Sequence, residues 1–112
     1  MTALSLEHIN IQTRDMARTI AFYRDLLGLE AKGAPRRDPA ERQWLYAGGR
    51  AVIHLNLFGT GNTVARDVQP GAATGAIHHV AFECDDFDAC LARIDESLSK
   101  LIDFAADGGF GD

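Results

Sequence analysis

Three histidines stand inside apolar, strand-like segments of this 112-residue chain, and their spacing suggests that they act together. His8 and His79 are 71 residues apart, and residues 6–11 align with residues 77–82 at the same offset. A third histidine, His54, lies in another apolar segment between them. Imidazole nitrogens are good ligands for divalent transition metals, and three that converge on one ion leave a position open for a substrate. The three histidines are therefore the candidate metal site.

The alternation of side chains along a strand supports this grouping. Successive residues point to opposite faces of a strand, and apolar Ile53 and Leu55 flank His54, so His54 points away from their face. The apolar neighbours of His79 have the same relation to it. The alternative is that each histidine is a polar residue on a half-solvated strand. Three histidines with matched alternation favour metal binding over that alternative.

The elements that would position the first histidines follow the order strand, helix, strand, strand, strand. Residues 4–12 alternate as in a strand with one apolar face. Asp15 is placed to cap a following helix, and Gly28 to end it. Two later strands flank Gly48 and Gly49, a pair typical of a two-residue hairpin, for which we expect a type I′ turn.

The second half of the sequence repeats only the beginning of this pattern. Residues 59–75 are rich in Gly, Thr, Asn and Pro, which predicts a linker. A strand is expected over residues 76–84, and then a helix from about Phe87 to at least Leu98. The counterpart of His54 at the repeat offset would lie beyond the last residue. The chain thus predicts one full module and part of a second.

Composition excludes some functions. A net charge of -5 argues against nucleic acid and anionic membranes as partners, and no segment is apolar enough to span a bilayer. The N-terminal residues do not resemble a signal peptide, so we expect a cytoplasmic protein. Cys84 and Cys90 have neither metal-binding nor redox spacing and are expected to be buried thiols.

Four motifs and the order of elements resemble the vicinal oxygen chelate superfamily, which includes glyoxalases, bleomycin-resistance proteins and extradiol dioxygenases. The motifs are residues 6–11, 22–29, 51–55 and 77–82. The resemblance implies an α+β fold of paired βαβββ modules, of which the second is incomplete.

The resemblance also sets the expected boundaries. Residues 1–112 form a single domain, in which residues 4–58 are the first module and residues 76–105 the partial second one. Unpaired strand edges and exposed apolar surface would result, so we expect a homodimer.

The resemblance also implies a ligand set and a class of reaction. His8, His54 and His79 correspond to three metal ligands, whereas the usual fourth, a glutamate, has no counterpart in these residues. The metal would be Zn, Fe, Ni, Co or Mn. The implied function is a lyase, isomerase or dioxygenase acting on a small molecule with adjacent oxygens; its catalytic residues are unknown. The alternatives are a metal-free protein that sequesters a small molecule, as bleomycin-resistance proteins do, and a truncated relative with impaired activity.

Three further side chains are candidates for contact with the substrate. Asn10 and Asn56 share the alternation of the histidines and could orient substrate oxygens, although polar residues on a solvated strand are the more common interpretation of such a pattern. Trp44 could form an apolar wall, or could belong to the core.

Overall fold

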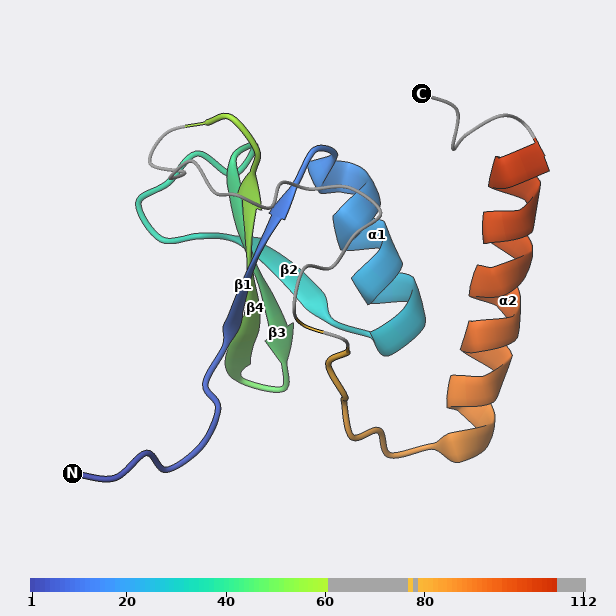
Figure 1. The fold of residues 1–112 in the computed structure, drawn as a ribbon, viewed down its shortest axis with the longest axis horizontal. Coiled ribbons are helices and arrows are strands. Elements are labelled where there is room, and N and C mark those ends of the chain that lie inside the picture. The colour runs from blue at the N-terminus through green and yellow to red at the C-terminus, as the bar shows by residue number, and fades with distance from the viewer. Residues whose placement is uncertain (61–76, 78, 107–112) are drawn as a thin grey trace.

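The computed structural model describes residues 1–60, 77 and 79–106, and a mixed sheet of four strands lies at its centre. The strands are β1 (Ile9–Thr13), β2 (Glu30–Gly33), β3 (Arg42–Ala47) and β4 (Arg50–Leu57). They lie side by side in the order β1-β4-β3-β2 (Figure 1). β1 is parallel to β4, whereas β3 is antiparallel to both of its neighbours. With a helix between β1 and β2, this is a βαβββ order, and the predicted α+β class is confirmed.

Helix α1 (Met16–Leu27) begins and ends at the residues that the sequence indicates. The Asp15 carboxylate accepts a hydrogen bond of 3.0 Å from the Arg18 backbone N–H, which satisfies a free donor of the first turn. Gly28 ends the helix in the left-handed region, with φ 70°, and its N–H donates to the Arg24 carbonyl at 2.9 Å.

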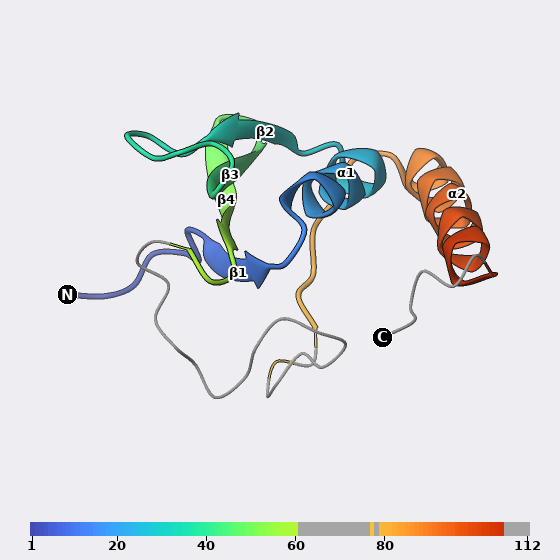
Figure 2. The ribbon, with the colours of Figure 1, turned by 90° about the horizontal axis from the view of Figure 1, so that it is seen from above.

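The core lies between α1 and one face of the sheet. Leu45, Ile53 and Leu55 are fully buried there. Because side chains alternate along β4, His54 and Asn56 point to the opposite face. Both helices lie on the same side of the sheet (Figure 2), so no helix of residues 1–60, 77 and 79–106 covers this second surface, which we call the open face. The fold therefore presents His54 on a surface that a ligand can reach.

The β3–β4 hairpin is present, but its turn is not the expected one. Ala47 pairs with Arg50, so Gly48 and Gly49 are the two turn residues. Only Gly48 has a positive φ, of 63°. A type I′ turn needs positive φ at both central residues, whereas type II′ needs it at the first alone. The φ angles therefore favour type II′, and the expectation of type I′ was wrong.

Helix α2 (Phe87–Ala106) starts at the predicted residue and continues past Leu98, as expected. The Asp86 carboxylate accepts a hydrogen bond of 3.0 Å from the Ala89 backbone N–H. The helix lies beside α1 on the side away from the sheet (Figures 1 and 2). Its apolar residues Phe87, Leu91 and Ile94 are exposed. No helix of the described part is long and apolar enough to cross a membrane.

The strand expected over residues 76–84 is not present in the described part of that segment. Residues 77 and 79–84 have no strand structure, and residues 76 and 78 lie outside the described residues. Likewise, β1 begins at Ile9 rather than at residue 4. A strand exists only through hydrogen bonds to a neighbouring strand, and alternation in sequence does not provide that neighbour. Most of the predicted linker, residues 61–75, also lies outside the described residues.

The two cysteines are not buried, contrary to the expectation. Cys84 is exposed, and Cys90, in the first turn of α2, is partly exposed. Cys84 lies outside any helix or strand, and Cys90 lies on α2, which packs beside α1 rather than on the sheet. Apolar periodicity alone therefore misjudged their burial.

Candidate functional site

Three rings from adjacent segments of the sheet form a stack on the open face. The imidazole centroids of His54 and His8 are 3.8 Å apart, and their planes differ by 7°. The indole of Trp44 lies 4.3 Å from the same His54 ring, with planes 12° apart. β4 lies between β1 and β3, so His54 is the middle ring and its two faces are covered by His8 and Trp44.

Strand register explains why these rings meet. Trp44 of β3 is paired directly with His54 of β4. On the other side, Asn10 of β1 is paired with His54, and His8 precedes Asn10 by two residues on the same face. Diagonal neighbours on adjacent strands remain within reach of aromatic side chains. The sheet thus brings together two of the three predicted metal ligands and one predicted substrate-binding residue.

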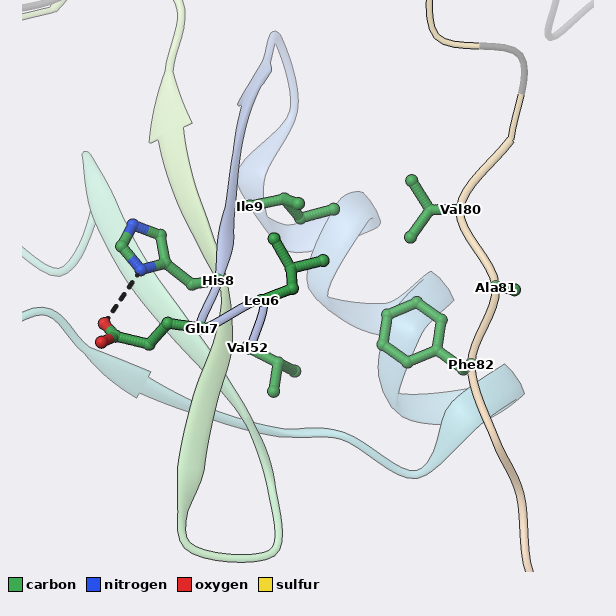
Figure 3. A pocket seen from close by; sticks show the side chains of 8 residues that line it. All are labelled: Leu6, Glu7, His8, Ile9, Val52, Val80, Ala81 and Phe82. Atoms are coloured by element: carbon green, nitrogen blue, oxygen red, sulfur yellow. Dashed lines mark hydrogen bonds and ion pairs between the residues drawn. The ribbon is translucent and has the colours of Figure 1, made fainter. Parts of the chain in front are cut away.

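The His8 imidazole has a carboxylate partner that the sequence interpretation missed. His8 Nδ1 lies 3.2 Å from Glu7 Oε1 (Figure 3). A carboxylate only accepts hydrogen bonds, so Nδ1–H of His8 is the donor in this contact, and in the neutral imidazole Nε2 then carries the lone pair. A carboxylate behind a histidine is a frequent support for metal ligation. The acidic residue directly before the histidine was the available signal for this role.

The environment of His54 favours its neutral form. Burial lowers the pKa of His54, and the positive charge that His8 can carry lowers it further. A hydrogen bond to the Ala51 backbone and the negative charge of Glu7 act in the opposite direction, with smaller effect. A histidine must be neutral to bind a metal ion, so the lowered pKa suits a ligand.

Next to the rings, two amide side chains form a pair. Asn56 Nδ2 donates a hydrogen bond to Asn10 Oδ1, across the β1–β4 boundary. Both residues share the face of His54. All three predicted substrate-binding residues, Asn10, Asn56 and Trp44, therefore lie on the open face near the imidazoles; their contact with a substrate remains a prediction.

His79 does not form a three-ligand group with the other two histidines in the described residues. It is an exposed residue of the segment that lacks strand structure. Its neighbours, residues 80–82, line an open, mostly apolar pocket together with residues 6–9 and Val52 (Figure 3). Within residues 1–60, 77 and 79–106, no three histidine, cysteine or acidic side chains are close enough to hold a metal.

Comparison with known proteins decides the family. The family model of the Glyoxalase/Bleomycin resistance protein/Dioxygenase superfamily matches residues 5–109. The chain belongs to this superfamily. Similarity to an ethylmalonyl-CoA/methylmalonyl-CoA epimerase of Cereibacter sphaeroides agrees: the two are 29% identical, over 87% of this chain and 73% of the relative.

A solved structure gives the same fold. It is an integron cassette protein from the mobile metagenome of V. cholerae, with a TM-score of 0.59 and 20% identity, over 87% of this chain and 70% of that chain. Membership in the glyoxalase superfamily and the epimerase relative support an enzyme of glyoxalase type acting on a small molecule.

Divalent metals are common in this superfamily, and the His8–His54 pair fits one by donor chemistry. Two imidazoles lie in contact, and in the neutral form of His8 its hydrogen bond to Glu7 leaves Nε2 available. Imidazole lone pairs lie in the plane of the ring, however, and the two planes are almost parallel. Joint ligation of one ion therefore requires one ring to turn out of the stack.

Proposed function

We propose that this chain is a metal-dependent enzyme that acts on a small molecule with adjacent oxygens. The observation that carries the proposal is the contact of two imidazoles on the open face, with a carboxylate behind one of them. His8 and His54 would hold the metal, and His79 would complete the set because it repeats the position of His8. When bound, a divalent ion supplies Lewis acidity to the two substrate oxygens.

The residues around the pair have separate roles in this proposal. The amide groups of Asn10 and Asn56 orient the substrate oxygens, because amides donate and accept hydrogen bonds. Trp44 provides a flat apolar surface beside them. Glu7 keeps the proton of His8 on Nδ1. No described residue is assigned as the catalytic base.

Among lyase, isomerase and dioxygenase reactions, the similarity to an epimerase favours the isomerase. The substrate class we propose is an acyl thioester that carries a carboxylate on its α-carbon. Its two carbonyl groups offer adjacent oxygens, and loss of the proton between them gives an enolate. Return of the proton to the other face of that carbon completes the epimerisation.

Hydrogen exchange tests this reaction. Methylmalonyl-CoA is incubated in D₂O with the chain and Zn²⁺ or Co²⁺, and loss of the α-proton signal is followed by NMR. We expect exchange above the rate with metal alone, and its loss in His54→Ala. Asn10→Ala should slow exchange and leave metal content unchanged, since Asn10 is assigned to the substrate. Exchange no faster than with the metal alone would contradict the proposed reaction.

A second candidate is a metal-free binding protein of the bleomycin-resistance type. The ring stack as it stands favours it, because parallel imidazoles and an indole offer flat surfaces to a planar or cationic ligand. The net charge of -5 would suit a cation. Binding of bleomycin by the metal-free chain, unchanged by His79→Ala and weakened by Trp44→Ala, would support this candidate over the enzyme.

We further propose that the chain works as a homodimer in the cytoplasm. β1 has a hydrogen-bonded neighbour, β4, on one side alone in the described part, and the apolar side chains of α2 are exposed. Such edges and surfaces are normally covered by a partner. Free thiols at Cys84 and Cys90 suit a reducing compartment. Light scattering at micromolar concentration should give the mass of a dimer, and a cooperatively folded monomer would contradict it.

A further inference from the structure

The His54 ring is held from one side by a residue that belongs to neither the core nor the histidine set. Trp44 is paired with His54 in the β3–β4 ladder, and the indole covers one face of the imidazole at 4.3 Å. A ring covered on its faces can be approached only at its edge, which is where the nitrogen lone pairs lie. The indole therefore leaves free the part of His54 that a metal ion would contact.

The two histidines differ in how firmly the fold holds them. His54 lies in the interior of β4, with strands on both sides. His8 precedes β1 and lies outside any strand, its side chain is 36% exposed, and its partner Glu7 is 83% exposed. If one ring must turn so that both reach one ion, His8 is the ring with fewer restraints.

We infer that Trp44 is a positioning residue for His54, and that a divalent metal ion separates the His8 ring from the stack while the Trp44–His54 stack persists. This inference rests on the proposed metal site. In this inference Trp44 orients His54, a proposed metal ligand, in addition to its proposed contact with the substrate.

The chain offers a matched set of variants for the test. Trp44→Phe keeps a flat ring, whereas Trp44→Leu removes it and keeps an apolar side chain. Tyr46→Leu is the control, because Tyr46 lies on the same strand and face as Trp44 and its ring contacts Lys32 instead of His54. Thermal unfolding of each variant establishes that it is folded.

The first readout is Zn²⁺ affinity by calorimetric titration. We expect Trp44→Leu to weaken affinity roughly three- to tenfold, the range that loss of one stacked aromatic pair corresponds to. Trp44→Phe and Tyr46→Leu should remain close to wild type. If the inference holds, Trp44→Leu binds Zn²⁺ less tightly than wild type. Equal affinity, in a protein whose zinc binding depends on His54, would overturn the positioning role of Trp44 but not the metal site.

The second readout is NMR of the ring protons with and without Zn²⁺. The His54 ring protons should show unchanged nuclear Overhauser contacts to the Trp44 indole in both states, whereas their contacts to the His8 ring should change on metal addition. Loss of the Trp44–His54 contacts on metal addition would overturn the inference. Absence of His54-dependent zinc binding in the wild type would overturn it together with the proposed metal site, so the two failures are distinguishable.

Discussion

His8 and His54 lie face to face, with ring centroids 3.8 Å apart and planes that differ by 7°. This relationship has two consequences for a member of the glyoxalase superfamily. It brings the imidazole of His54 in β4 and that of His8, just before β1, to one place, as a metal site needs. The nitrogen lone pairs of the two rings also lie in almost parallel planes. Binding of one metal ion by both rings therefore requires one ring to change its orientation. The stack is therefore a specific structural feature against which the proposed metal site can be tested.

The turn between β3 and β4 gives a test of backbone conformation within one dipeptide. Gly48→Ala should lower the free energy of unfolding by about 1–2 kcal/mol, because Gly48 has φ 63° and a Cβ disfavours that region. Gly49→Ala is the control, since Gly49 has no positive φ and no atom lies within 4 Å of an added Cβ. Urea unfolding measures both. Equal losses would contradict a turn with one left-handed residue.

Burial in the core predicts a large cost for Leu45→Ala. Leu45 is 0% exposed between α1 and the sheet, so truncation should lower the free energy of unfolding by about 2–5 kcal/mol. The same substitution at Leu4, which is 97% exposed, should change it by less than about 0.5 kcal/mol. Chemical unfolding measures both variants. An equal loss of unfolding free energy in Leu4→Ala and Leu45→Ala would contradict the described core.

Tyr23 of α1 predicts a loss of stability at alkaline pH. Burial raises the pKa of Tyr23 above its ordinary value of 10.0. The folded protein holds the phenol proton more tightly than the unfolded chain does. The free energy of unfolding is therefore highest below about pH 10 and falls as the pH rises through the folded pKa. Tyr23→Phe has no phenol proton and therefore lacks this pH dependence.

The comparison of wild type with Tyr23→Phe isolates that effect from other alkaline titrations. The difference in unfolding free energy should be constant from pH 7 to about pH 9.5, and should shift in favour of Tyr23→Phe above that. A difference that stays constant up to pH 11 would show that the Tyr23 phenol is not buried.

Local signals in the sequence predicted the first module well. The caps at Asp15 and Gly28 follow from side-chain and backbone chemistry within one turn, and the structure confirms both. The alternation around His54 correctly placed it opposite the buried Ile53. These inferences succeeded because each depends on residues close in sequence.

The failures concern contacts between distant parts of the chain. The alternation of residues 76–84 predicted a strand, but a strand needs a neighbour, and none is formed by residues 77 and 79–84. The repeat offset aligns His79 with His8 in sequence alone, and metal binding by His79 stays a prediction. Ring stacking of Trp44 on His54 depends on a register shift between Leu45 and Tyr46, because a regular two-residue hairpin would pair Trp44 with Ile53 instead.

Metal binding by the histidines is the most direct test of the proposed function. Metal-free chain is titrated with Zn²⁺ and freed of unbound ion, and metal per chain is measured for wild type, His8→Ala, His54→Ala and His79→Ala. His78→Ala serves as the control, because His78 is adjacent to His79 and outside the proposed set. We predict about one ion per wild-type and His78→Ala chain, with affinity lowered more than about tenfold in the other variants. Equal zinc content in all five proteins would contradict the proposed metal site.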